Sequence, residues 1–195
     1  MGRNAGSTPR LVVKAGEFAV HAHGQQARKD RRTPYFVHPI GVMRFLASEL
    51  GVTDTDILCA ALLHDVLEDT TTSPAVLTRR FGPKIAHIVE ELTVPKEYHG
   101  PWVPDRRKTA VLVDAIGRMS WEAVVVKLAD RYDNLLDMAN AQWGTVKKRS
   151  YRDQTREILA ALGRRMQGET PPRRLAEPIR RARASVRSRL AVAPR

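Results

Sequence analysis

The chain has 195 residues, 43% of them hydrophobic, so it is long enough to form one domain with a substantial buried core. Its single cysteine, Cys59, excludes an internal disulfide and favours a reducing compartment. No apolar run approaches membrane-spanning length and the first residues lack the apolar core of a signal peptide, so we expect a cytoplasmic protein.

The net charge of +12 is unevenly distributed along the chain. Residues 171–195 contain eight arginines and one glutamate, so this tail supplies +7 of the total. The high isoelectric point is therefore largely a property of the tail, and it says little about the residues that precede it.

Apolar residues recur at helical spacing through most of the chain, and Gly and Pro separate the periodic stretches. Residues 1–9 have nothing to bury and are predicted to be disordered. In chain order, helices are predicted over about residues 10–23, 35–50, 54–69, 74–81, 84–92, 105–119, 121–139 and 145–166.

Local capping signals support several of these boundaries. Gly51 suits the C-terminal cap of the second helix, and Thr53 or Asp54 suits the N-terminal cap of the third. Ser120 is predicted to cap the helix that follows it.

One segment is ambiguous between strand and helix. Val124, Val125 and Val126 favour a strand by local propensity, but the apolar repeat continues through Leu135 at helical spacing. The sequence therefore predicts an all-α bundle of seven to nine helices, with its folded domain at residues 10–167.

Residues 168–195 form an arginine-rich C-terminal extension that allows two interpretations. An apolar stripe at helical spacing suggests a basic amphipathic helix that contacts nucleic acid or an anionic surface. The alternative is a solvated or disordered basic extension, and the absence of aromatic residues argues against single-strand recognition by base stacking. The stripe consists of Leu175, Ile179, Ala182, Val186 and Leu190.

Four ionisable residues lie close together in the apolar segment 60–69: His64, Asp65, Glu68 and Asp69. Two pairs are four residues apart, so we expect each pair to share one face of a single helix. Burying such groups without partners is costly, and a divalent cation held by imidazole and carboxylate is a natural partner. The alternative is a solvated helix face, which the surrounding leucines and valines disfavour.

Two further segments carry groups that could join this cluster. His38, followed by Pro39, sits at the predicted start of a helix, where a capping or packing role is the alternative to metal binding. Asp130 and Asn134 share a helix face, although a salt-bridged surface turn would also explain them.

Taken together, these segments resemble the HD phosphohydrolase superfamily, and within it the hydrolase domain of the RelA/SpoT-type alarmone enzymes, especially the stand-alone small alarmone hydrolases. The resemblance covers roughly residues 10–160. The motifs that carry it are Arg28-Lys29, Pro34-Tyr35, His38-Pro39, His64-Asp65, Glu68-Asp69, Asp130 and Asn134.

The resemblance implies an HD-domain helical bundle and a four-ligand site for Mn²⁺. By position, the metal ligands would be His38, His64, Asp65 and Asp130. Two imidazoles and two carboxylates suit Mn²⁺ and leave positions for water and a phosphate oxygen.

The resemblance also implies the remaining roles in the site. Glu68 and Asp69 would be the catalytic pair that positions or deprotonates the attacking water. The residues implied to bind substrate are Arg28, Lys29, Asn134, Lys147 and Tyr151. For Arg28 and Lys29 the alternative is a solvated basic loop.

The implied reaction is metal-dependent hydrolysis of the guanine nucleotide alarmones ppGpp and pppGpp at the 3′-pyrophosphate, giving GDP or GTP and pyrophosphate. We expect degradation without synthesis, because the chain ends before a synthetase domain could follow. Two alternatives stay open: an HD phosphohydrolase acting on another nucleotide, such as a nucleoside monophosphate or NADPH, or a non-catalytic module that binds alarmone or nucleic acid. The resemblance leaves the role of loop 94–104 and the existence of a homo-oligomer open.

Overall fold

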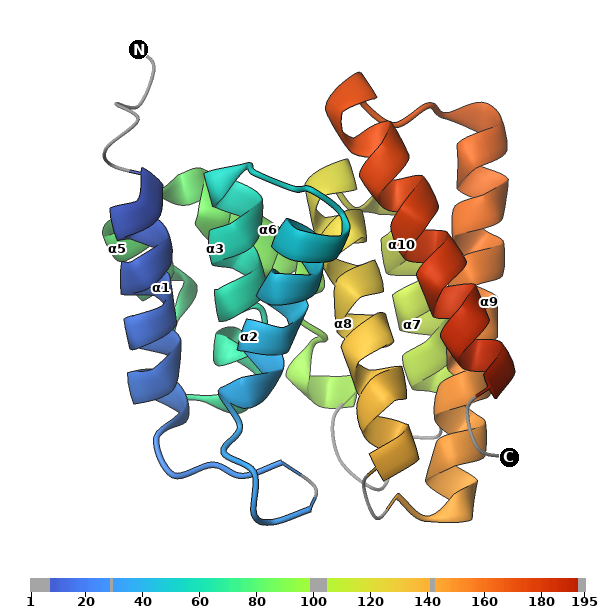
Figure 1. The fold of residues 1–195 in the computed structure, drawn as a ribbon, viewed down its shortest axis with the longest axis horizontal. Helices are drawn as coiled ribbons and strands as arrows, with labels where there is room; N and C mark the ends of the chain where they lie inside the picture. The colour runs from blue at the N-terminus through green and yellow to red at the C-terminus, as the bar shows by residue number, and fades with distance from the viewer. Residues whose placement is uncertain (1–7, 29, 99–104, 141–142, 193–195) are drawn as a thin grey trace. The chain divides into compact units, whose positions relative to one another are not determined.

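The computed structural model describes residues 8–28, 30–98, 105–140 and 143–192 (Figure 1). The chain divides into two compact units, Met1–Thr93 and Val94–Arg195. The described residues contain helices and one isolated bridge between Ala27 and Pro34, but no β-strand, so the all-α prediction is confirmed. The predicted disorder of residues 1–9 falls mainly outside the described residues.

The first unit is built around one central helix. In chain order its elements are α1 (Thr8–His23), α2 (Val37–Arg44), the π-helical turn η1 (Phe45–Glu49), α3 (Thr55–Leu63), α4 (Val66–Asp69), α5 (Pro74–Phe81) and α6 (Pro83–Leu92). Helix α3 packs against α1, α2 and α6 (Figure 1). Its sequence is apolar almost all round, as expected for a helix covered on several sides, and Cys59 is buried within it.

The helix boundaries in this unit follow the capping chemistry of the sequence. The Asp54 side chain accepts hydrogen bonds from the backbone N–H groups of Asp56 and Ile57, so Asp54 rather than Thr53 is the cap. Gly51 has a φ of 69° just beyond the second helix, as a left-handed C-terminal cap requires. That helix is α-helical only to Arg44, and η1 completes it.

The prediction of one continuous helix through residues 54–69 is wrong. Helix α3 ends at Leu63, His64 and Asp65 form a turn, and the single turn α4 begins at Val66. His64 Nδ1 lies 2.8 Å from the carbonyl oxygen of Ala61, which in an unbroken helix would accept from the Asp65 backbone N–H. The imidazole thus competes for the helical hydrogen bond at the point where the helix stops.

The second unit consists mainly of four longer helices. Its elements are the 3₁₀ turn η2 (Lys96–Tyr98), α7 (Asp105–Arg118), α8 (Trp121–Asn140), α9 (Thr145–Gly168) and α10 (Arg173–Val192). Helix α8 packs against α10, and α7 packs against α9. Residues 99–104 of the loop 94–104 lie outside the described residues.

Residues 124–126 are helical and completely buried, which excludes the competing strand. The Ser120 hydroxyl accepts from the Ala123 backbone N–H at 3.1 Å, so the predicted cap is confirmed. Burial on every side explains why β-branched residues are tolerated here: packing outweighs their modest helix-propensity cost.

Arg165 of α9 contacts the end of α7 and the start of α8. Its guanidinium donates to the carbonyls of Ile116 and Met119, at 2.9 and 2.7 Å, which the end of α7 would otherwise leave unsatisfied. It also lies 3.9 Å from the Trp121 ring centroid and is paired with Glu169. One arginine therefore joins three helices of this unit.

The C-terminal extension forms a long helix whose apolar stripe is buried. The stripe predicted from the sequence, Leu175, Ile179, Ala182, Val186 and Leu190, is the set of buried residues of α10. Since α10 packs on α8, these side chains are covered by protein, and the arginines occupy the other faces. No described helix has the length and apolar character needed to cross a membrane.

The docking of α10 can be tested by removing one buried side chain. Ile179 is completely buried, so Ile179→Ala should lower the free energy of unfolding by about 2–5 kcal/mol. Val192, on the same helix and 72% exposed, provides the control, and Val192→Ala should change it by less than about 0.5 kcal/mol. Urea unfolding followed by circular dichroism measures both; equal stabilities would contradict a packed α10.

Candidate metal and hydrolytic site

Three predicted ligands converge in the first unit. His38 lies at the start of α2, and His64 and Asp65 form the break between α3 and α4. One ligand atom from each residue lies within 4.8 Å of the others. His64 Nε2 is 3.2 Å from His38 Nε2 and 3.1 Å from Asp65 Oδ2, and His38 Nε2 is 3.6 Å from the same carboxylate oxygen.

The tautomer of His64 follows from its backbone contact. The carbonyl oxygen of Ala61 can only accept, so His64 Nδ1 carries the hydrogen, and in the neutral ring Nε2 offers its lone pair to the cluster. An imidazole oriented in this way by a carbonyl is common among metal-bound histidines. His64 and His38 are both buried, 2% and 3% exposed, so they favour a shared partner over bulk water.

The donor set formed by His38, His64 and Asp65 fits a divalent cation. Two imidazole nitrogens and a carboxylate oxygen face one point, and two neutral imidazole lone pairs 3.2 Å apart would otherwise oppose each other. A proton between the rings would relieve this locally. A cation satisfies all three groups at once.

Tyr35 links the cluster to the predicted catalytic pair. Its hydroxyl lies 2.7 Å from Asp65 Oδ2 and 2.9 Å from Asp69 Oδ2, so the two carboxylates share its one hydrogen. Burial, followed by the charges of the two carboxylates, raises the Tyr35 pKa well above its usual range, so the phenol stays neutral and keeps its proton. One hydroxyl therefore links the carboxylate of a predicted ligand, Asp65, to that of a predicted catalytic residue, Asp69.

His23, the last residue of α1, and Gln26, in the segment after it, support this arrangement. Gln26 Nε2 donates to the backbone carbonyl of Asp69 at 2.7 Å, and its side-chain oxygen lies 2.8 Å from His23 Nδ1. The His23 ring lies against the Tyr35 ring, with centroids 4.6 Å apart. His23 and Gln26 were missed by the sequence reasoning, and Tyr35 was included in a motif without a role. The available signal was a tyrosine three residues before His38.

Glu68 and Asp69 are placed by the single turn α4. The backbone N–H groups of both residues donate to the Asp65 carbonyl, at 3.1 and 2.8 Å. Glu68 is half-buried and Asp69 is exposed. The predicted acidic pair is therefore held through the backbone to Asp65, one of the predicted ligands.

Arg28, the described member of the predicted basic pair, belongs to a loop closed by hydrogen bonds. The Arg28 N–H donates to the Thr33 carbonyl at 2.7 Å, and Asp30 accepts from the Thr33 hydroxyl and from the N–H groups of Arg32 and Thr33. These hydrogen bonds, the one from the Thr33 hydroxyl first, lower the Asp30 pKa to about 2. The loop that carries Arg28 is thus folded, and Lys29 lies outside the described residues.

Asp130 and Asn134 belong to the second unit, on α8. Asp130 is buried, accepts from Asn134 Nδ2 at 2.5 Å, and has Lys127 Nζ 3.4 Å from its other oxygen. The two residues share a helix face as predicted, and Lys127 adds a buried cation to which the sequence reasoning assigned no role.

Lys147 and Tyr151 both lie near the side chain of Trp143. Trp143 is buried, its ring centroid is 5.3 Å from that of Tyr151, and Lys147 Nζ lies 5.4 Å from the same indole. Arg131, which follows Asp130 on α8, places its guanidinium 4.5 Å from the Tyr151 ring centroid. Trp143 and Arg131 were missed, and an aromatic residue four before Lys147 was the only local signal.

Comparison with known proteins identifies the family. The HD-domain family model matches residues 15–168, most of the chain. The guanosine-3′,5′-bis(diphosphate) 3′-pyrophosphohydrolases MESH1 of Xenopus tropicalis and Homo sapiens are 37% and 36% identical to it; each alignment covers 80% of this chain and 87% of the relative. A guanosine-3′,5′-bis(diphosphate) 3′-pyrophosphohydrolase of Aquifex aeolicus is 36% identical, and this chain matches 21% of its length.

A solved structure agrees with the sequence relatives. The structure described as a metazoan ortholog of SpoT that hydrolyzes ppGpp matches with a TM-score of 0.75 and 27% identity, covering 97% of this chain and 98% of that one. The resemblance inferred from the ordered motifs is therefore confirmed. The chain belongs to the HD-domain family of phosphohydrolases and, within it, to the RelA/SpoT-homologue group.

Proposed function

We propose that this chain is a metal-dependent guanosine-3′,5′-bis(diphosphate) 3′-pyrophosphohydrolase that converts ppGpp and pppGpp into GDP and GTP with release of pyrophosphate. The observation that carries the proposal is the convergence of His38, His64 and Asp65 in a chain whose relatives bear that name. An HD domain with this cluster implies a divalent cation.

The proposed ligands are His38, His64, Asp65 and Asp130, and the proposed ion is Mn²⁺. Mixed imidazole and carboxylate ligation suits this ion. When bound, it would lower the pKa of a water molecule and polarise a phosphoryl oxygen. The tautomer of His64, fixed by Ala61, supports its assignment as a ligand through Nε2.

Glu68 and Asp69 are the proposed catalytic pair. The oxygen of water forms a bond to the phosphorus nearest the ribose, the bond from that phosphorus to the 3′-oxygen breaks, and the 3′-oxygen takes a proton. A carboxylate accepts the proton lost by the water. The Tyr35 hydroxyl holds Asp69 beside Asp65, so its carboxylate is positioned before substrate arrives.

Substrate binding is assigned to Arg28, Lys29, Asn134, Lys147 and Tyr151. Tyr151 meets Trp143 edge-to-face and lies under the Arg131 guanidinium, and these contacts support an ordered aromatic surface beside Lys147. Cationic side chains would offset the charge of a bis-diphosphate in the ground and transition states. We further propose a cytoplasmic location, based on the single buried Cys59.

Incubation of the purified protein with Mn²⁺ and ppGpp should release GDP and pyrophosphate in equal amounts. The reaction should stop when EDTA removes the metal. Nucleotide chromatography and a pyrophosphate assay measure both products. Metal binding without release of either product would reject the alarmone as substrate and favour a different nucleotide; loss of both metal binding and turnover would favour a non-catalytic module.

Ligand and catalytic roles can be separated by two classes of substitution. His64→Ala or Asp65→Ala should lose bound metal and activity together, because each removes a group from the converging cluster. Glu68→Gln should retain the metal and lose turnover by about 100-fold or more, because the amide cannot accept a proton. Elemental analysis and initial rates provide the measurements. Full activity in either class would contradict the proposed site.

The positioning role of Tyr35 predicts a distinct kinetic pattern. Tyr35→Phe should lower kcat by about 10–100-fold with little change in KM, because Asp65 and Asp69 lose their common donor. Tyr132→Phe is the control, since Tyr132 packs near Arg189 of α10 and lies outside the proposed machinery. Metal content and kinetics of both variants are compared. A rise in KM alone, with kcat preserved, would exclude this role for Tyr35.

A further inference from the structure

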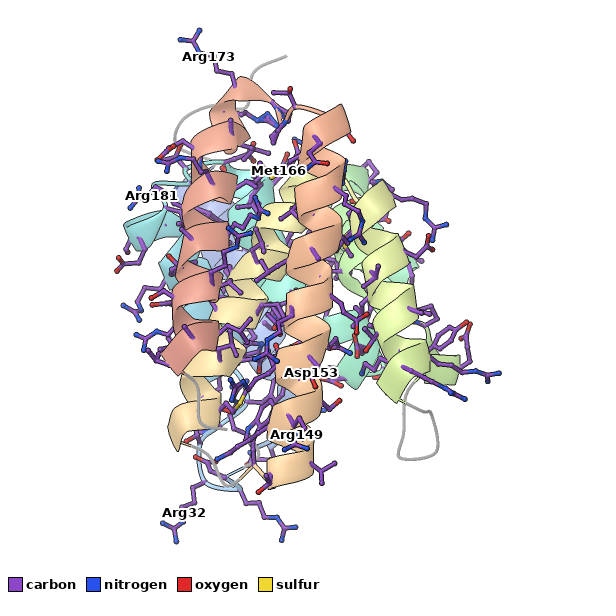
Figure 2. The ribbon with its side chains drawn as sticks, turned by 90° about the vertical axis from the view of Figure 1, so that its right-hand side faces the viewer. Arg32, Arg149, Asp153, Met166, Arg173 and Arg181 are labelled. Carbon is purple, nitrogen blue, oxygen red and sulfur yellow. The ribbon has the colours of Figure 1, made fainter. Side chains whose placement is uncertain are left out.

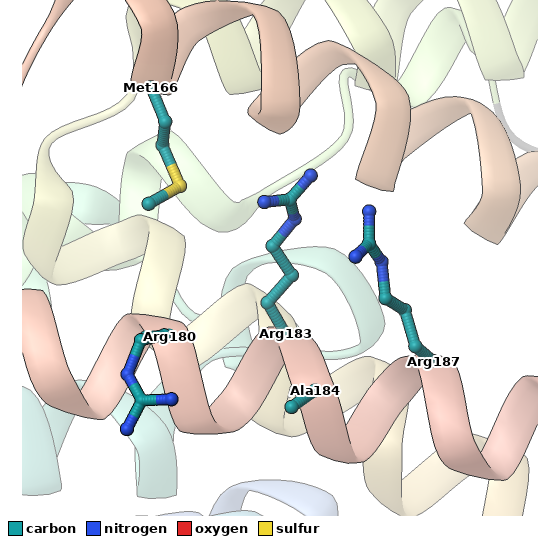
Figure 3. Close-up of a pocket in the computed structure, with 5 residues that line it drawn as sticks. All are labelled: Met166, Arg180, Arg183, Ala184 and Arg187. Atoms are coloured by element: carbon teal, nitrogen blue, oxygen red, sulfur yellow. The ribbon is translucent and has the colours of Figure 1, made fainter.

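The second unit contains a basic cavity between α9 and α10 (Figure 3). Its volume is about 330 Å³, near the lower end of the range of small-ligand sites, which is about 300–1,000 Å³. Its lining consists of Met166, Arg180, Arg183, Ala184 and Arg187. None of these five residues belongs to the proposed metal, catalytic or substrate-binding set.

Two of the arginines extend from α10 toward α9. Figure 3 shows the Arg183 and Arg187 side chains directed from their helix toward the one that carries Met166. Arg183 Nε is buried and has no hydrogen-bond partner among the described residues. Burial, followed by the charge of Arg187, lowers the Arg183 pKa, so the cationic form lacks a compensating group there.

The absence of a side chain at Gly163 allows Arg183 to occupy this position. A Cβ atom placed on Gly163 would lie 2.6 Å from Arg183 Nη2, too close for the two to coexist without movement. Gly163 lies inside α9, where glycine costs about 1 kcal/mol relative to alanine. The space above this glycine is filled by a guanidinium group.

The third arginine is already paired. Arg180 binds Glu177 through two hydrogen bonds, at 2.8 and 2.6 Å, and both residues belong to α10. None of the described residues that line the cavity is acidic. Among the described residues, Arg183 and Arg187 therefore supply the cationic charge of the lining that no acidic side chain offsets.

We propose that this cavity is a second anion site, which binds a compact diphosphate through Arg183 and Arg187. Planar guanidinium groups bind phosphate oxygens in a bidentate manner, and two of them match an anion with more than one negative charge. The small volume and the lack of an aromatic residue in the lining favour a compact anion over a nucleic acid strand. The same chemistry fits inorganic pyrophosphate and the diphosphate of a nucleotide.

The test is calorimetric titration of inorganic pyrophosphate into the full chain, in EDTA so that no divalent metal takes part. Arg183→Gln should weaken binding by about tenfold or more, because the variant loses the charged, bidentate hydrogen bonding of a guanidinium group to phosphate. The control is Arg181→Gln, which removes the same charge from the side of α10 facing away from α9 (Figure 2) and should leave the affinity within about twofold. A parallel titration with ADP shows whether a nucleotide diphosphate or only the free anion is accepted.

A second pair of variants changes no charge. Gly163→Ala should displace Arg183 and weaken pyrophosphate binding, whereas Gly117→Ala on α7, whose added Cβ meets nothing within 4 Å, should not. Thermal unfolding by circular dichroism establishes that each variant is folded. Arg183→Lys keeps the charge but lacks the planar guanidinium group, so this variant should also bind pyrophosphate more weakly.

Four outcomes would overturn the proposal. Equal losses for Arg183→Gln and Arg181→Gln would indicate a diffuse basic surface, as would tighter and strongly salt-dependent binding of RNA. No saturable binding of pyrophosphate would exclude the site. An unchanged affinity in folded Gly163→Ala would show that the position of Arg183 does not matter. Because the readout is binding without metal, failure here is distinct from failure of the proposed hydrolysis.

Discussion

The hydrogen bond between His64 and the carbonyl of Ala61 is the contact on which the candidate site depends. It occupies a helical acceptor where α3 ends, and it fixes the imidazole tautomer that presents Nε2 to His38 and Asp65. The turn that follows places an Asp65 carboxylate oxygen near both imidazoles, and α4 begins directly after it. A single side-chain contact therefore links the end of a core helix to the orientation of the proposed ligands.

The position of the site at the end of α3 has an energetic reason. Helix α3 is apolar and packed by three neighbours, so the backbone at its end is held firmly. Polar groups placed there must be satisfied locally, since an unpaired buried donor or acceptor costs about 1–3 kcal/mol. Tyr35 and Gln26 provide such partners for Asp65 and Asp69, and this polar network gives the site its rigidity.

Features that depend on a few neighbouring residues could be predicted from the sequence, whereas contacts between distant residues could not. The Asp54 and Ser120 caps and the apolar stripe of α10 follow from a few neighbouring residues, and these predictions are confirmed. The break at His64 could not be predicted, because the apolar periodicity continues through it and only a side-chain contact interrupts the helix. The Tyr35 and Gln26 links join residues 30 to 43 positions apart, which no local pattern reveals.

The excess of positive charge in the tail also has a structural interpretation. Arginines of α9 and α10 use their long side chains to pack and pair within the unit: Arg165 with Trp121 and Glu169, Arg174 with Glu122, and Arg189 near Tyr132. Part of this charge therefore belongs to the helical framework of the second unit. Since Arg180 already pairs with Glu177, the positive charge at the cavity between α9 and α10 comes from Arg183 and Arg187.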